Sequence, residues 1–182
     1  MPITVDQFWE QYAFQPYELI RGEVHKSEPL GFRYAIVGMR VEASLLQFTE
    51  EHNLGEVFGA NNGYRLNRYT LRAPRVSYIT HSKFRHITRP YHYLPFAPDI
   101  AVEIIDTDTP EQQTRLMSAQ YVRAGTRYVW VFQPDLLQMM IYSRFEAPQR
   151  LTIYDTLTAP IWHPDFAVPL SDLLPKPRGM SL

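Results

Sequence analysis

The chain has 182 residues, of which 45% are hydrophobic and 14% aromatic, and it contains no cysteine. This composition supplies enough apolar surface for a sizeable core and excludes disulfides, thiolate chemistry and cysteine-ligated zinc. The formal net charge of −1 by itself indicates no partner.

These properties lead us to expect one domain over residues 1–175, followed by a frayed tail over residues 176–182. The first residues lack the basic flank and apolar run of a secretory signal, and no apolar stretch is long enough to cross a bilayer. We therefore expect a cytoplasmic protein that does not associate with a membrane.

The start of the chain predicts a short helix followed by two short strands. Thr4 and Gln7 have the spacing of a capping box, which marks the beginning of a helix. Farther on, Arg21 and Gly22 interrupt the alternating residues over 17–24, which indicates a tight turn between two strands.

A long amphipathic helix is predicted next, because apolar residues recur at three- and four-residue steps up to residues 52–53. The residues that we expect to face the core are Ile36, Met39, Ala43 and Leu46. Aromatic and β-branched residues over 55–66, broken by Gly59 and Gly63, then predict a hairpin. Since residues 75–79 predict a further strand, we expect a sheet that is at least partly antiparallel.

The second half of the chain predicts a functional loop and a buried sheet. Residues 81–98 are rich in proline, histidine and aromatic residues without periodicity, which is typical of a long ordered loop. The run Ile100–Ile105 is apolar except for Glu103, as expected for a central strand covered on both faces. The remaining predicted elements are a helix over 111–124, a strand over 128–132 and a hairpin of strands over 138–142 and 150–154.

Charge is distributed unevenly along the chain. Residues 57–98 contain no Asp or Glu and carry +7, which leaves −8 on the remainder. Interleaved with aromatic residues, these cations are typical of a surface that binds phosphates and stacks bases. The acidic remainder offers an alternative partner for them, within one chain or across a homodimer. The residues that we assign to nucleic-acid binding, with DNA as the expected partner, are Arg65, Arg68, Lys83, Arg85 and Arg89.

Glu103 is the most informative single residue, because a carboxylate in an apolar strand needs a metal, a cation or hydrogen bonds. It suits either a divalent cation such as Mg²⁺ or an arginine as its partner. Asp99 lies four residues earlier on the same strand face, but at ~3.3 Å per residue the two Cα atoms lie ~13 Å apart. A shared ion would need a further carboxylate, for which the candidates are Glu18, Glu23 and Asp106.

Several segments resemble the successive motifs of the Uma-two family, whose members are labelled putative restriction endonucleases. These segments are Tyr17–Glu23, Ala73–Ser77, Ala97–Ile105, Tyr121–Trp130 and Pro164–Phe166. The resemblance covers nearly the whole chain and implies the PD-(D/E)XK nuclease superfamily. Together with the element pattern it predicts an α/β fold of restriction-endonuclease type, with a mixed central sheet flanked by helices and an antiparallel hairpin extension.

The resemblance also implies a site and a reaction, the Mg²⁺-dependent hydrolysis of DNA phosphodiesters. It implies catalytic roles for Glu103, Asp99 and Glu23, with Glu103 and Asp99 as the metal ligands. Whether Glu23 or Glu18 faces the site is left open by the sequence.

Three positions depart from the family pattern. Arg75 stands where the pattern has a metal-binding Asp, Met117 where it has a Lys, and Arg33 where it often has a His. If Arg75 lies beside Glu103, its guanidinium would take the place of the metal and pair with the carboxylate.

Three functions are consistent with these residues. The first is an endonuclease with a partly degraded active site. The second is a catalytically inactive nuclease-fold module that serves nucleic-acid binding or oligomeric assembly, which Arg75 and Met117 favour. The third is a purely structural oligomer subunit, which would show no salt-dependent binding to DNA.

Overall fold

The computed structural model describes residues 1–27, 29 and 31–176, so the tail predicted over 176–182 lies outside the described residues except for Lys176. The helices are α1 Val5–Tyr12, α2 Phe32–Glu51, α3 His81–Phe84, α4 Glu111–Arg123 and α5 Leu170–Leu173, with a 3₁₀ turn η1 over Pro134–Leu136. The strands of the first half are β1 Tyr17–Ile20, β2 Glu23–Lys26, β3 Gly55–Phe58, β4 Tyr64–Asn67, β5 Thr70–Arg72 and β6 Val76–Thr80. Those of the second half are β7 Ile100–Ile104, β8 Tyr128–Gln133, β9 Gln138–Ser143, β10 Gln149–Thr152, β11 Thr156–Ala159 and β12 His163–Pro169.

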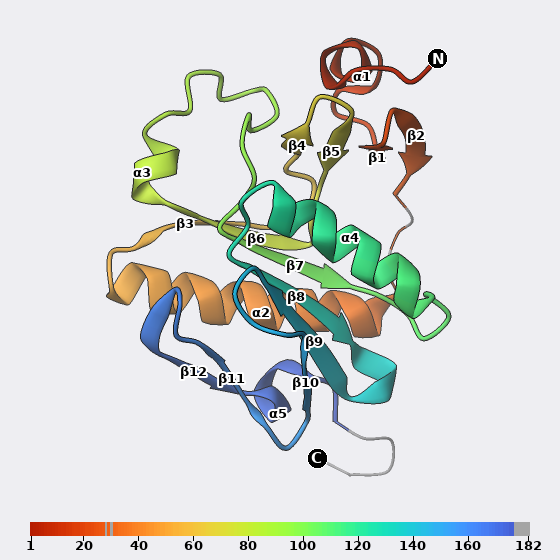
Figure 1. Ribbon diagram of the computed structural model, residues 1–182. Coiled ribbons are helices and arrows are strands. Elements are labelled where there is room, and N and C mark those ends of the chain that lie inside the picture. The colour runs from red at the N-terminus through yellow and green to blue at the C-terminus, as the bar shows by residue number, and fades with distance from the viewer. Residues whose placement is uncertain (28, 30, 177–182) are drawn as a thin grey trace.

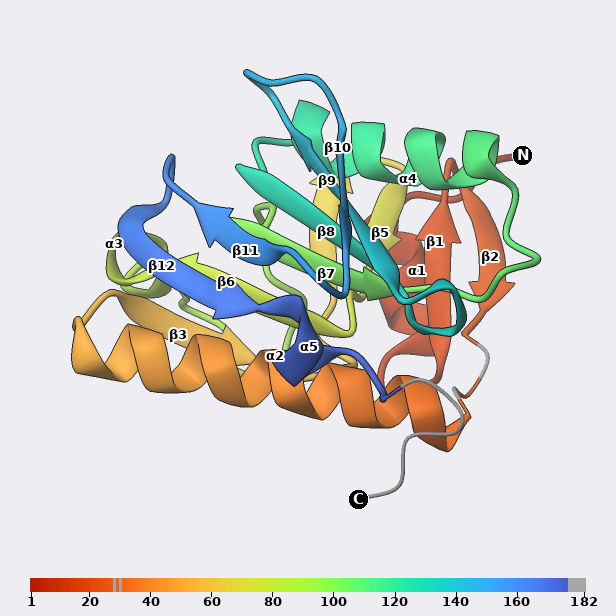
Figure 2. The same cartoon turned by 90° about the horizontal axis from the view of Figure 1, so that it is seen from below.

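A six-stranded main sheet in the order β10-β9-β8-β7-β6-β3 forms the centre of the molecule. Only β7 and β8 in this sheet run parallel, and α4 provides the crossover between them. Helix α2 covers one face and α4 the other, while β11, β12 and α5 lie on the α2 side (Figures 1 and 2). This mixed sheet flanked by helices confirms the predicted fold class.

The two central strands divide their side chains between two apolar cores, as their continuous apolar sequence predicts. Val102 and Trp130 are fully buried on the α2 side, and Ala101 and Val131 on the α4 side. Because side chains alternate along a strand, Glu103 shares the α4 face with Ala101. The alternation of side chains along β7 therefore directs Glu103 toward α4.

A smaller antiparallel sheet in the order β2-β1-β5-β4 lies beside α4 and supports α1 (Figure 1). It is the antiparallel extension that the sequence predicts. The turn between β1 and β2 places Arg21 at φ 54° and Gly22 at φ 84°, the left-handed conformations that a two-residue hairpin requires. The predicted capping box is confirmed, since the Thr4 backbone donates to Gln7 Oε1 at 2.8 Å and the Gln7 backbone donates to Thr4 Oγ1 at 3.3 Å.

Two sequence predictions about packing are wrong. Residues 55–66 do not form a hairpin, because β3 pairs with β6 in the main sheet while β4 pairs with β5 in the smaller sheet. Strand pattern identifies a strand but not its partner, which depends on non-local contacts.

The buried face of α2 is also rotated from the predicted one. Met39 and Leu46 are 64% and 42% exposed, respectively, whereas the buried row contains Val37, Val41 and Leu45. A helix that lies on a sheet makes contact through residues spaced four apart, which lie on one face. Several apolar residues outside this face remain in water. None of the described helices is both long and apolar enough to cross a membrane.

Candidate functional site

The candidate site lies where β7, α4 and the smaller sheet meet, and Glu103 is at its centre. The Tyr121 hydroxyl, which comes from α4, donates to Glu103 Oε1 at 2.7 Å. Tyr121 is fully buried and is therefore held in one position, so it orients the carboxylate. The hydrogen bond connects the two most specific pieces of the family resemblance, the strand that ends in Glu103 and the helix end at Tyr121.

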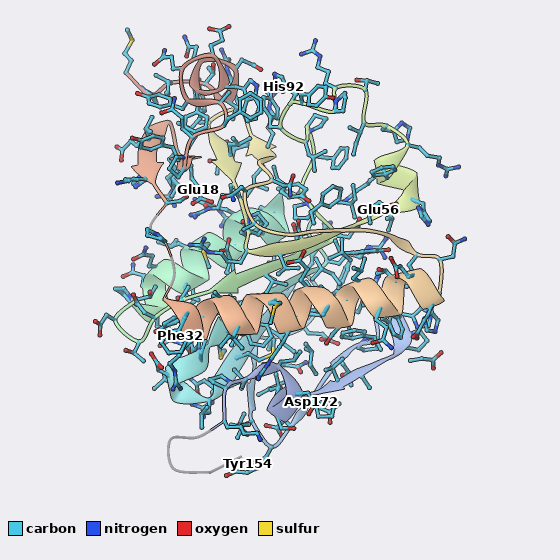
Figure 3. All side chains as sticks on the ribbon, turned by 180° about the vertical axis from the view of Figure 1, so that it is seen from behind. Glu18, Phe32, Glu56, His92, Tyr154 and Asp172 are labelled. Carbon is cyan, nitrogen blue, oxygen red and sulfur yellow. The ribbon has the colours of Figure 1, made fainter. Side chains whose placement is uncertain are left out.

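A second carboxylate, Glu18 of β1, lies at the base of the smaller sheet (Figure 3). Its Oε2 accepts from Arg72 Nη1 at 3.3 Å and its Oε1 from the Ala73 backbone N–H at 2.7 Å. Arg72 Nε also donates to Gln120 Oε1 of α4 at 2.9 Å. One guanidinium therefore ties the smaller sheet to α4 and neutralises Glu18.

The surroundings of Glu103 favour its neutral form. Removal from water raises the pKa of Glu103 to about 7, and the negative charge of Glu18 adds to this effect. The Tyr121 hydrogen bond and the positive charges of Arg72 and Arg75 act in the opposite direction. The four charged groups thus belong to one electrostatic cluster, in which two carboxylates face two guanidinium groups.

Arg75 lies beside Glu103, a placement that the sequence leaves open. Its backbone N–H donates to the Val102 carbonyl at 2.9 Å, immediately before Val76 pairs with Val102 in the β6–β7 register. Continuing that register by one residue sets Arg75 opposite Glu103. The position at which the family pattern has an acidic ligand is occupied by a cation that lowers the pKa of Glu103.

Asp99 belongs to a separate cluster at the other end of the same strand. Its carboxylate contacts Lys83 Nζ at 3.1 Å and Arg127 Nε at 3.5 Å, and it accepts from the Thr80 backbone at 3.0 Å. Asp99 is only 3% exposed, and Lys83 and Arg127 balance its charge locally. The structure does not bring Asp99 together with Glu103, in keeping with their separation of ~13 Å along the strand.

Of the remaining acidic candidates, neither Glu23 nor Asp106 joins the Glu103 cluster. Glu23 has an 82% exposed side chain on β2, where it lies 3.9 Å from His25. Asp106 accepts from the Thr109 hydroxyl at 2.9 Å and stabilises the turn before α4. The early glutamate that faces the site is Glu18.

The cations assigned to nucleic-acid binding divide into two groups. Lys83 is committed to Asp99 and to the Ala97 carbonyl at 2.8 Å, and Arg68 lies over the Tyr69 ring at 5.5 Å. Arg65 is partly buried near Tyr93. Arg68, Arg85 and Arg89 are exposed and form no ion pair within the described part of the chain, and of these three only Arg68 has a cation–π contact there.

The sequence identifies Arg72 only as one of the seven basic residues over 57–98 and does not indicate its place in the site. The signal for it is its position three residues before Arg75, on a strand next to the motif that carries Glu18. Tyr121 was part of a recognised motif, but its hydrogen bond to Glu103 depends on how α4 packs. Met117 lies one turn earlier on α4 and packs with the Tyr121 core, so it provides an apolar group on the side of α4 that faces the sheet.

The side chains around Glu103 can be compared with the ligands that Mg²⁺ requires. Mg²⁺ takes an oxygen-rich octahedral site with one or two carboxylates, waters and phosphate oxygens. Across residues 1–27, 29 and 31–176, no group of three or more His, Cys, Asp or Glu side chains is arranged to hold a metal ion. Because Arg72 pairs with Glu18 and the positive charge of Arg75 also acts on Glu103, these residues do not fit a Mg²⁺ centre.

Comparisons with known proteins agree with this fold. The family model Uma2, described as "Putative restriction endonuclease", matches residues 5–171. A solved structure that the chain resembles is that of a putative nuclease belonging to DUF820 from Anabaena variabilis, with a TM-score of 0.79. The sequences are 17% identical, and the match covers 94% of this chain and 97% of that chain, which shows a shared fold. A search of curated proteins found no match.

Proposed function

Because the chain belongs to the Uma2 family of putative restriction endonucleases, we propose that it is a nuclease-fold protein that binds nucleic acid without Mg²⁺-dependent cleavage. The observation that carries this proposal is the pairing of charges at the site. Glu18 is held by Arg72, and Arg75 stands opposite Glu103 where the family pattern has an acidic metal ligand.

The pairing opposes metal-dependent chemistry in two ways. A guanidinium beside each carboxylate repels Mg²⁺ and competes with it for the carboxylate oxygens. Met117 in place of the expected Lys removes a cation that would stabilise charge in the transition state, an effect often worth ~3 kcal/mol, or about a hundredfold in rate. Binding of the metal and the chemical step are both weakened.

Nucleic-acid binding is supported by the position of the basic segment. Its strands β4 and β5 and the loop after α3 lie above the main sheet, on the face that carries α4 and the candidate site (Figure 1). Arg85 and Arg89 are exposed on this loop, where phosphates have free access to their guanidinium groups. The segment also contains exposed aromatic residues, including Tyr91.

Fluorescence anisotropy with labelled duplex and single-stranded DNA tests the binding. Changing both Arg85 and Arg89 to Ala should weaken binding and reduce the slope of log K against log salt by about two. Arg144→Ala, on the β9–β10 turn, is the matched control and should leave the slope unchanged. Absence of binding at low salt, or indifference to the double change, would overturn this half of the proposal.

A plasmid-nicking assay with Mg²⁺ or Mn²⁺ tests the other half, and the unmodified protein should leave the plasmid intact. The second candidate is a relocated active site, which is favoured by the pKa of Glu103 near 7, a value suited to a general base. Metal-dependent nicking by the unmodified protein that disappears in Glu103→Gln would establish this second candidate instead.

A further inference from the structure

A pocket of about 480 Å³ lies next to the candidate site and has no role in the function proposed above. Its lining includes residues of α1 and the segment that follows it, and residues of the loop over 90–92. The Tyr93 hydroxyl donates to Asp6 Oδ1 at 2.6 Å, which fixes this loop to α1. The volume falls within the range of small-molecule sites, roughly 300–1,000 Å³.

Aromatic rings form a large part of the lining of this pocket. The Trp9 ring lies 4.9 Å from the His92 ring and 5.6 Å from the Phe14 ring, measured between centroids. Phe14 is 83% exposed and Tyr91 is 84% exposed, although both are large apolar side chains. Exposed rings gathered around one concave surface mark a binding site rather than a core.

The backbone at Phe14 supports a functional role for this ring. Phe14 has φ 63°, a left-handed conformation that is strained for a bulky aromatic residue. Strained conformations of this kind persist at ligand sites, where the position of the side chain matters for binding. Here the strained residue presents its ring at the pocket instead of burying it.

Polar groups and one cation complete the pocket. The side chain of Asn62 donates to the Gly59 carbonyl at 3.1 Å, which orients its amide beside the rings. Arg72 and Ala73 line the pocket and also bind Glu18, so the pocket and the candidate site share a wall. Figure 3 shows His92 beside α1 and Glu18 where the smaller sheet meets the main sheet.

We propose that this pocket receives one unpaired nucleobase of a bound single strand. The inference rests on the proposed function, since it assumes that nucleic acid binds on this face. Every base has an aromatic face that stacks on Trp, Tyr or Phe, and a polar edge that an amide can recognise.

Stacking on the two exposed rings provides the test. Tyr91→Ala and Phe14→Gly should each weaken binding of a labelled single-stranded oligonucleotide by on the order of tenfold. Both residues are exposed, so the variants should fold, and Phe14→Gly should raise the Tm because glycine accepts positive φ. Tyr154→Ala is the matched control, since Tyr154 is 94% exposed at the opposite end of the molecule from His92 (Figure 3).

A fluorescent base analogue reports the pocket directly. The fluorescence of 2-aminopurine within an oligothymidylate should be quenched on binding to the unmodified protein, and this quenching should be lost in Tyr91→Ala. If both ring variants bind like the unmodified protein while the Arg85 and Arg89 changes still weaken binding, the pocket inference is overturned and the proposed function stands. If no nucleic acid binds at low salt, both are overturned.

Discussion

Glu103 combines a hydrogen bond, a neighbouring carboxylate and two nearby cations, and these effects compete for its protonation state. The pKa of Glu103 is raised from 4.5 to about 7, first by burial and then by Glu18. Between these two values the folded protein holds a proton that the unfolded chain has already released. The free energy of unfolding therefore falls as the pH rises through this window, and the loss is complete above it.

Glu103→Gln removes this ionisation while keeping an oxygen that accepts from Tyr121. The free energy of unfolding of the variant, relative to the unmodified protein, should increase by about 2 kcal/mol between pH 5 and pH 8. Urea denaturation at several pH values measures the difference. The same substitution at the exposed Glu23 is the control and should follow the unmodified protein, whereas parallel pH profiles for Glu103→Gln would show that Glu103 ionises freely.

Arg75 is the residue at which a metal site could be restored. Arg75→Asp replaces a cation with a third carboxylate in a cluster that already contains Glu18 and Glu103, so we expect measurable Mg²⁺ or Mn²⁺ binding. Calorimetric titration of the variant and the unmodified protein measures it. Arg144→Asp changes the net charge equally at a distant turn and should not bind metal. Strong metal binding by the unmodified protein would contradict the charge-paired site.

At the scale of elements, α4 and β7 are the pair that assembles the site. Tyr121 and Gln120 are consecutive on α4, yet they bind different partners, Glu103 and Arg72. A small rotation of α4 would disturb both hydrogen bonds together. The placement of α4 against β7 and the smaller sheet therefore controls both hydrogen bonds of the site.

The face of α2 is the element-scale prediction that is simplest to test. Val41 is 1% exposed against the main sheet, so Val41→Ala should lower the free energy of unfolding by about 2 kcal/mol. Met39 is 64% exposed, and Met39→Ala should change stability by less than about 0.5 kcal/mol. Chemical denaturation of the two variants compares them. Equal losses of stability in the two variants would instead support the buried face of α2 that the apolar spacing alone predicts.

At the scale of the whole molecule, the basic segment and the candidate site share one side of the main sheet. A ligand that binds only the folded state stabilises it and raises the Tm, by an amount that grows with the logarithm of the ligand concentration above the Kd. Single-stranded DNA should therefore raise the Tm at low salt, while Mg²⁺ alone should leave it unchanged. Differential scanning fluorimetry measures both, and a Tm that rises with Mg²⁺ but not with DNA would contradict the proposed function. The single domain and the homodimer stay predictions.

Local signals in the sequence predicted most of the elements and the family. The capping box at Thr4, the Arg21-Gly22 turn and the apolar run around Glu103 each depend on neighbours close along the chain, and each is confirmed. The motifs around Tyr17 and Asp99 identified the family, since they are short segments that keep their order.

The tertiary structure decided what depends on residues distant in the chain. Only the pairing of β3 with β6, and of β4 with β5, separates the main sheet from the smaller one, and strand pattern does not choose between partners. The same packing selects Glu18 over Glu23 and assigns Asp99 to Lys83. It also brings α1 and the 90–92 loop together at the pocket. The charge pairs and the pocket join residues that are far apart in the sequence, so only the folded structure identifies them.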